Sequence, residues 1–66
     1  MLIMRISMLT GDVHEMDLDI TPAQLESYEL FGVLLQDAFP NLTASEREFI
    51  KSGITPEEWD KYLGVE

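Results

Sequence analysis

The chain has 66 residues, no cysteine and a formal net charge of −9, from 13 acidic and 4 basic side chains. A chain of this length forms at most one domain, and the lack of cysteine excludes disulfides and thiolate metal sites. The negative charge disfavours direct contact with nucleic acid or an anionic membrane and favours a basic partner.

No apolar stretch of the sequence approaches the ~20 residues that cross a bilayer. Residues 1–5 also lack the basic region and the small-residue cleavage site of a secretory signal. We therefore expect a protein of a reducing cytoplasm, without a membrane partner.

Residues 2–9 and 13–20 are predicted to form an antiparallel hairpin. In the second segment, apolar side chains and a histidine alternate with valine and acidic side chains, which is typical of a half-buried strand. The connecting residues 10–12 contain a glycine that can adopt the left-handed conformation of a three-residue turn. We therefore expect Leu9 to pair with Val13.

This register predicts one apolar face, formed by the even-numbered residues of both strands. The expected core face consists of Leu2, Met4, Ile6, Met8, His14, Met16, Leu18 and Ile20. Arg5 is expected opposite Asp17 on the outer face. A shift by one residue would turn carboxylates towards the core, so the alternation favours this register.

Three segments begin with the same helix-start signal, a threonine followed three residues later by glutamine or glutamate. The pairs are Thr21 with Gln24, Thr43 with Glu46, and Thr55 with Glu58. In each pair the hydroxyl can accept a hydrogen bond from the later backbone N–H, while the longer side chain reaches back to the threonine N–H. In the first and third, proline occupies the first helical position, where its missing N–H costs nothing.

The first helix is expected to span residues 22–38, because Pro40 disfavours a helical conformation at the residue before it. The second is expected to span residues 44–52 and to end at Gly53, a left-handed cap. The third is expected to span residues 56–63. All three need a packing partner, because short helices are unstable in isolation.

The predicted fold is a single α+β domain over residues 1–66, a two-stranded antiparallel hairpin packed on three helices in the order ββααα. The first strand contains one charge and no proline, so its edge lacks the usual protection against pairing. We expect this edge to pair with a second copy and form a homodimer. A target protein or the C-terminal residues 65–66 are the alternative occupants.

Most apolar residues of the helices lie at spacings that give one-sided stripes. The first helix contributes Leu25, Tyr28, Phe31, Gly32, Leu35, Ala38 and Phe39, and the shorter helices contribute Phe49, Ile50, Trp59, Tyr62 and Leu63. Leu30 and Val33 instead project onto the polar side of the first helix. Either another helix covers them, or they form the apolar centre of an interface ringed by acids.

The sequence offers no catalytic constellation. Its single histidine, His14, lies on the apolar face of a strand, where a core or rim position is far more common than a general base. The acids of residues 12–19 do not follow the calcium-loop pattern, and they diverge too widely along a strand to surround one ion. We therefore expect no catalytic residue, no metal site and no cofactor. The helix–turn–helix pattern of residues 43–63 places acids where a DNA-reading helix needs bases, so direct nucleic-acid binding is not expected.

The acids of the second strand form a regular row. Glu15, Asp17 and Asp19 recur at a spacing of about 6.8 Å, which is comparable in scale to successive phosphates of a nucleic acid. With Glu26, Glu29 and Asp37 of the first helix they could present a phosphate-like array to a basic groove. The simpler interpretation is a solvated strand face. The predicted partner-binding residues are Glu15, Asp17, Asp19, Glu26 and Asp37, together with Leu30 and Val33 as an apolar anchor.

Residues 35–60, LQDAFPNLTASEREFIKSGITPEEWD, resemble a recurrent pattern in small accessory proteins encoded by bacteriophages. The resemblance covers roughly the C-terminal half of the chain and implies a protein made in the cytoplasm of a bacterial host. It assigns no role to any residue.

Size, charge and this resemblance favour a non-enzymatic protein that binds and inhibits a basic host protein, such as a nuclease. The most concrete version is an anti-CRISPR or other anti-defence inhibitor that acts by nucleic-acid mimicry. The first alternative is a structural or scaffolding accessory of the phage that acts by self-assembly. A metal-dependent enzyme is the third.

Overall fold

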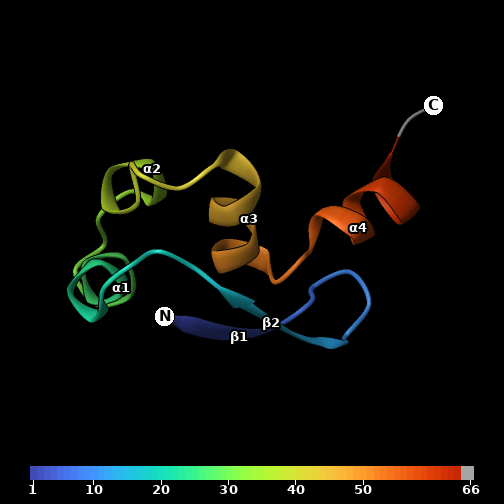
Figure 1. The fold of residues 1–66 in the computed structure, drawn as a ribbon, viewed down its shortest axis with the longest axis horizontal. Coiled ribbons are helices and arrows are strands. Elements are labelled where there is room, and N and C mark those ends of the chain that lie inside the picture. Colours follow the sequence, from blue (N-terminus) through green and yellow to red (C-terminus); the bar gives the residue numbers. More distant parts are fainter. Residues whose placement is uncertain (65–66) are drawn as a thin grey trace.

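The computed structural model describes residues 1–64, which fold into an N-terminal antiparallel strand pair followed by several helices. The elements are β1 (Leu2–Ile6), β2 (Val13–Asp17), α1 (Pro22–Glu29), α2 (Leu35–Ala38), α3 (Ala44–Ser52), α4 (Pro56–Glu58) and the π-helix η1 (Trp59–Leu63). Helices α1 and α2 lie at one end of the molecule, α3 lies over the hairpin, and α4 lies beside the hairpin turn (Figure 1). The predicted α+β class is confirmed.

The predicted register of the hairpin is wrong by three residues. Ile3 pairs with Met16, and Arg5 pairs with His14. The error comes from the turn, in which Ser7 N–H donates to the Asp12 carbonyl at 2.8 Å, so that residues 8–11 make the connection instead of residues 10–12. The Ser7 hydroxyl also accepts hydrogen bonds from two backbone N–H groups of the turn. Such local side-chain bonds compete with the ladder, and both strands are shorter than predicted.

A shift by an odd number of residues turns β1 over. Side chains of β2 keep the predicted orientation, and Leu18 and Ile20 are buried beyond its end. On β1, however, Ile3 is buried, whereas Leu2, Met4 and Ile6 have 57–65% of their surface exposed. The prediction that these three residues, with Met8, belong to the core is wrong.

Arg5 lies on the inner face of the hairpin and not opposite Asp17 on the outer face, as predicted. Its Nε donates to the carbonyl of Ile50 at 3.1 Å, and one terminal nitrogen lies 2.7 Å from a carboxylate oxygen of Glu29. The Ile50 carbonyl belongs to the last turn of α3, where a cation is favourable to the helix dipole. Arg5 therefore connects β1 to both α3 and α1.

The first predicted helix is two helices. Helix α1 ends at Glu29 and α2 begins at Leu35, and between them Gly32 has a φ of +71°. Glycine enters this left-handed conformation without steric cost, and the conformation ends the helix. The break turns Phe31, predicted on the buried face, into solvent with 76% of its surface exposed.

The capping predictions are confirmed at all three helix starts, where both bonds of each capping box are present. Helix α3 has the predicted bounds, with Gly53 left-handed at its end. The third helix starts at Pro56 as predicted, but its last five residues form the π-helix η1. Its apolar stripe is not a core stripe, since Trp59, Tyr62 and Leu63 are all exposed.

The core lies between the inner face of the hairpin and helices α2 and α3. Phe39 and Phe49 are fully buried at its centre, and the ring of Tyr28 packs edge-on against Phe39 at 5.9 Å. The other buried members of this cluster are Ile3, Leu18, Ile20, Ala38, Leu42 and Ile50. Within residues 1–64, no helix combines the length and the apolarity needed to cross a membrane. Residues 65–66, one predicted cover for the β1 edge, lie outside the described part.

The observed register predicts that two neighbouring truncations in β1 lower the free energy of unfolding by very different amounts. Ile3→Ala should lower the free energy of unfolding by about 2–4 kcal/mol, because it opens a cavity beside the core. Met4→Ala should change it by less than about 0.5 kcal/mol, because that side chain faces solvent. Urea unfolding of both variants measures the difference, and the reverse order would contradict the register.

Gly53 is constrained more tightly than Gly32, although both have a positive φ. A Cβ on Gly53 would overlap the carbonyl of Ile6, whereas a Cβ on Gly32 would meet nothing within 4 Å. Gly32→Ala should therefore cost only the left-handed strain, about 1–2 kcal/mol. Gly53→Ala should cost about 2–5 kcal/mol, because β1 and the end of α3 must also separate. Equal losses in urea unfolding would show that the close approach is absent.

Candidate functional site

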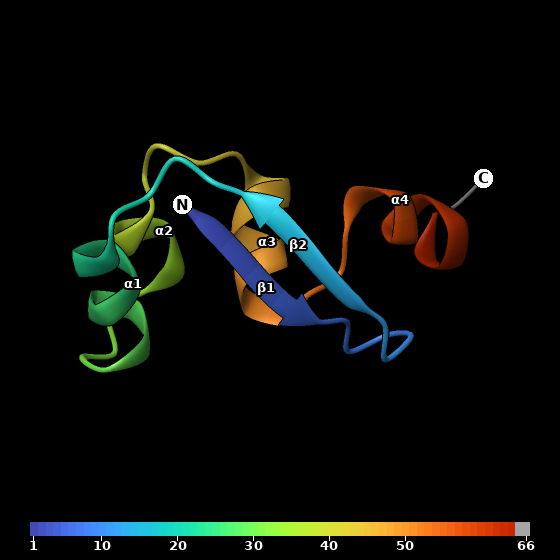
Figure 2. The same ribbon diagram turned by 60° about the horizontal axis from the view of Figure 1, so that its bottom comes forward.

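The observed register leaves the outer face of the hairpin uncovered. We call it the outer sheet face; it consists of Leu2, Met4, Ile6, Val13, Glu15 and Asp17. All six residues are exposed, and in Figure 2 the hairpin lies in front of α3, with no other helix or strand of residues 1–64 over this side. An exposed apolar patch rimmed by polar groups is typical of a surface that binds another molecule.

Three of the predicted binding acids lie on or beside β2. Glu15 and Asp17 belong to the outer sheet face, whereas Asp19 is exposed in a bend after β2 has ended. The predicted row along one strand is therefore interrupted before its third member. The terminal amino group of Met1 lies 3.0 Å from Asp17, whose side chain keeps 83% of its surface exposed.

The other two predicted acids lie on different elements. Glu26 is exposed on α1 and Asp37 is exposed on α2, so the structure places them on the helices and not on the hairpin.

The predicted apolar anchor of Leu30 and Val33 is divided by the break between α1 and α2. Leu30 has 71% of its surface exposed, whereas Val33 packs against the core cluster. Phe31, which is predicted on the buried face of the first helix, and Leu34 are also exposed, close to Leu30 in sequence. This second apolar surface, the α1–α2 turn, was missed because a continuous helix would have placed Phe31 inside.

A polar cluster joins the hairpin turn to α4, and Glu58 is at its centre. The capping box orients this side chain, because its Oε1 accepts a hydrogen bond from Thr55 N–H at 3.2 Å. Its other oxygen, Oε2, accepts a hydrogen bond from the Thr10 hydroxyl at 2.7 Å and lies 2.9 Å from Nε2 of His14. The carboxylate that caps α4 therefore also holds α4 against the hairpin.

Glu58 is only 8% exposed, yet it remains a carboxylate at neutral pH. Burial raises its pKa, but hydrogen bonds from His14, Thr10 and Ser7 and from the Thr55 backbone outweigh that effect and lower the pKa from 4.5 to about 2. Charge-assisted bonds of this kind are among the stronger ones in proteins. The ionised form of Glu58 is therefore specifically stabilised by the fold.

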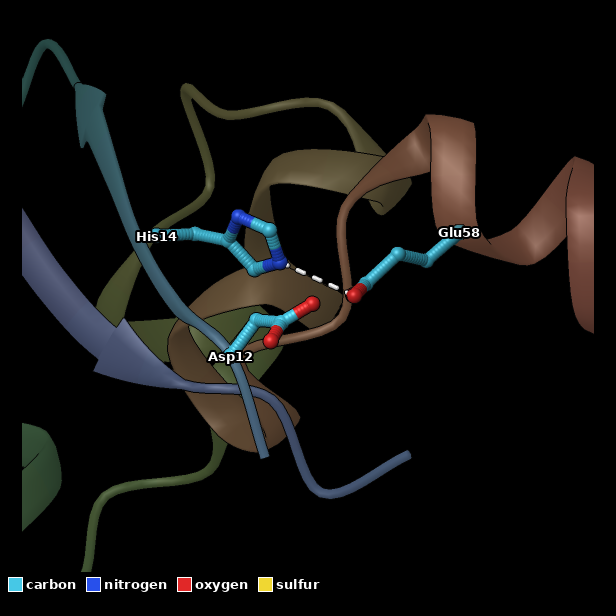
Figure 3. A group of neighbouring side chains, drawn as sticks. All are labelled: Asp12, His14 and Glu58. Carbon is cyan, nitrogen blue, oxygen red and sulfur yellow. Dashed lines mark hydrogen bonds and ion pairs between the residues drawn. The ribbon is translucent and has the colours of Figure 1, made fainter. Parts of the chain in front are cut away.

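The same cluster contains three groups that could hold a metal ion. One ligand atom from each of Asp12, His14 and Glu58 lies within 4.8 Å of the others, and Figure 3 shows the three side chains converging. They border an open groove of about 620 Å³, which is also lined by Lys61 and Tyr62. Chemically, the cluster offers one imidazole nitrogen and carboxylate oxygens to a cation or a proton.

Sequence reasoning placed His14 on the inner face and predicted a core or rim role for it. It missed the cluster because Glu58 follows His14 by 44 residues and was recognised only as a capping residue. No local spacing carries that information. Neither a protein-family model, nor a curated protein, nor a solved structure matches the chain.

The lowered pKa of Glu58 predicts an acid-dependent contribution to stability. A group with a pKa near 4.5 when unfolded and about 2 when folded stabilises the fold fully above 4.5 and loses this contribution as the pH falls towards 2. Glu58→Gln should therefore lower the melting temperature at pH 7 and flatten its decrease between pH 5 and pH 2.

Glu57→Gln is the matched control, because Glu57 is exposed in the same short helix. It should leave both the melting temperature at pH 7 and its acid dependence close to those of the parent chain. Thermal unfolding followed by circular dichroism in the presence of EDTA measures all three proteins. Parallel acid profiles for the parent and Glu58→Gln would contradict the assignment.

Proposed function

We propose that this chain is a small interaction protein, not an enzyme, that binds a basic host protein through the outer sheet face. The supporting observation is the exposed apolar row of Leu2, Met4, Ile6 and Val13, with Glu15 and Asp17 beside it. Removing such apolar surface from water contributes about 25 cal/mol per Å² before the costs of association. The apolar row therefore supplies affinity.

The acids beside the row select the partner. With a net charge of −9, the chain repels anionic surfaces and attracts cationic ones over roughly the Debye length. Carboxylates at the rim of an interface act mainly on the rate of association and on partner choice. A basic protein that exposes apolar side chains within a cationic surface is the complementary partner.

The biological context of the proposal comes from the resemblance of residues 35–60 to small phage proteins. In that context the bound protein is a host defence factor, most concretely a CRISPR-associated nuclease, which the chain inhibits in the bacterial cytoplasm. Glu15 and Asp17 of the outer sheet face would then occupy a groove that normally holds nucleic acid, and Asp19, Glu26 and Asp37, which lie on other segments, would add to the negative field around it. This mode requires that binding weakens steeply with salt and that DNA or RNA competes.

The alternative proposal is a structural accessory that assembles with further copies of itself. The exposed apolar row and the unprotected edge of β1 favour it, because both could be covered by a second copy. The homodimer predicted from that edge belongs to the same proposal. Mutual repulsion between chains of charge −9 opposes it at low salt.

Two double variants distinguish the surfaces that could bind. Met4→Ser with Ile6→Ser changes the outer sheet face, and Leu30→Ser with Phe31→Ser changes the α1–α2 turn. All four side chains are exposed, so both proteins should keep the fold and the melting temperature within a few degrees. Capture from bacterial lysate, identification by mass spectrometry and titration of the purified partner provide the measurement.

The parent chain should retain a basic protein that is released as salt is raised. The outer-face variant should bind that protein at least about tenfold more weakly, which corresponds to ~1.4 kcal/mol, and the turn variant should bind like the parent. Loss of binding in the turn variant alone would refute the assignment of the surface. Light scattering that shows growing assemblies of the pure chain, with no partner retained, would favour the structural accessory.

A further inference from the structure

We propose that Asp12, His14 and Glu58 form a binding site for a single Zn²⁺ ion at the junction between the hairpin turn and α4. The ligand atoms would be Nε2 of His14 and one carboxylate oxygen from each acid, which lie within 4.8 Å of one another. This inference does not depend on the proposed function, because none of these residues belongs to the outer sheet face.

The composition of the cluster selects the metal. Zn²⁺ binds imidazole nitrogen and carboxylate oxygen in a tetrahedral arrangement, and sites with three protein ligands leave the fourth position to water. Ca²⁺ and Mg²⁺ prefer six or more oxygen ligands, which two carboxylates and an imidazole do not supply. Among divalent ions, imidazole suits zinc and the neighbouring transition metals.

The geometry needs only a small adjustment to accept the ion. In a tetrahedral site with ligand distances of about 2.0 Å, neighbouring ligand atoms lie about 3.3 Å apart. The distance between His14 Nε2 and Glu58 Oε2 is already 2.9 Å. Asp12 is the exposed member of the cluster, so its side chain is free to approach the other two.

The Asp12 carboxylate is the group that points to a bound cation. Its backbone N–H is fixed by a hydrogen bond to the Thr10 hydroxyl, which positions the residue at the end of the turn. Within residues 1–64, however, its carboxylate makes no hydrogen bond or ion pair, although it points towards His14 and Glu58 (Figure 3). A carboxylate beside a second, buried carboxylate is repelled by it, and a divalent cation between them reverses that repulsion.

Glu58 is already held in a fixed orientation by hydrogen-bond donors that would lie around the metal site. Thr10 donates to its Oε2 and Thr55 N–H donates to its Oε1, so both oxygens are held by the turn and by the helix start. Hydrogen bonds of this outer kind fix ligand orientation in metal sites and contribute to affinity. Because two ligands come from around the start of β2 and the third comes from α4, a bound ion would connect the two segments and raise the stability of the fold.

The test uses the full chain without a histidine tag, treated with EDTA and dialysed. Isothermal titration with ZnCl₂ should show one ion per chain, and thermal unfolding should shift to higher temperature with zinc but not with MgCl₂. Since His14 is the sole histidine of the sequence, its imidazole signals in a proton NMR spectrum report ligation without ambiguity. Those signals should shift during the same titration.

Asp12→Asn and Asp19→Asn form the matched pair, because each removes one exposed carboxylate and only Asp12 belongs to the cluster. Asp12→Asn should weaken zinc binding at least about tenfold, and Asp19→Asn should leave it unchanged. His14→Gln should abolish the response. No heat of binding in the parent chain, unmoved His14 signals, or equal affinities for the two Asp variants would overturn the proposal.

Discussion

The covered face of the two-stranded sheet is the constraint on which the rest of this structure depends. A hairpin of this size is at best marginally stable in water until one of its faces is buried. Helix α3 lies over the face that carries Ile3 and Arg5, and residues that follow β2 complete the core. Arg5 takes part in this packing through its bond to the last turn of α3. The choice of inner face also determines which side chains are left for other molecules.

The parts of the fold that depend on near neighbours in sequence could be predicted. Helix α3 has its predicted bounds because Thr43 with Glu46 and the left-handed Gly53 are local signals at its two ends. The register could not be predicted in the same way. It depends on whether the Ser7 hydroxyl bonds to the turn or leaves the strand to continue, and both outcomes satisfy the alternation of β2. Gly32 was placed on an apolar face, although its conformational freedom ended the helix.

The outer sheet face and the polar cluster around Glu58 differ in how far the sequence could reveal them. Glu15 and Asp17 follow from the alternation of one strand, and the structure places both on the exposed side. The apolar half of the outer sheet face was assigned to the core, because the wrong register turned Met4 and Ile6 inward. The polar cluster could not be inferred at all, since it brings together residues of the hairpin and of α4 through tertiary packing. In both cases the missing information was the relation between segments and not the nature of the residues.

The position of Glu58 explains how such a short C-terminal helix remains attached to the hairpin. Helix α4 has three residues before it continues as η1, and the aromatic side chains that follow are exposed. A segment of this length does not hold a helix by propensity alone. The carboxylate of Glu58 instead accepts one hydrogen bond from the start of α4 and one from the hairpin turn. Leaving a buried carboxylate without its hydrogen-bond donors costs more free energy than the same hydrogen bonds contribute when they form. The start of α4 and its contact with the hairpin turn therefore depend on each other.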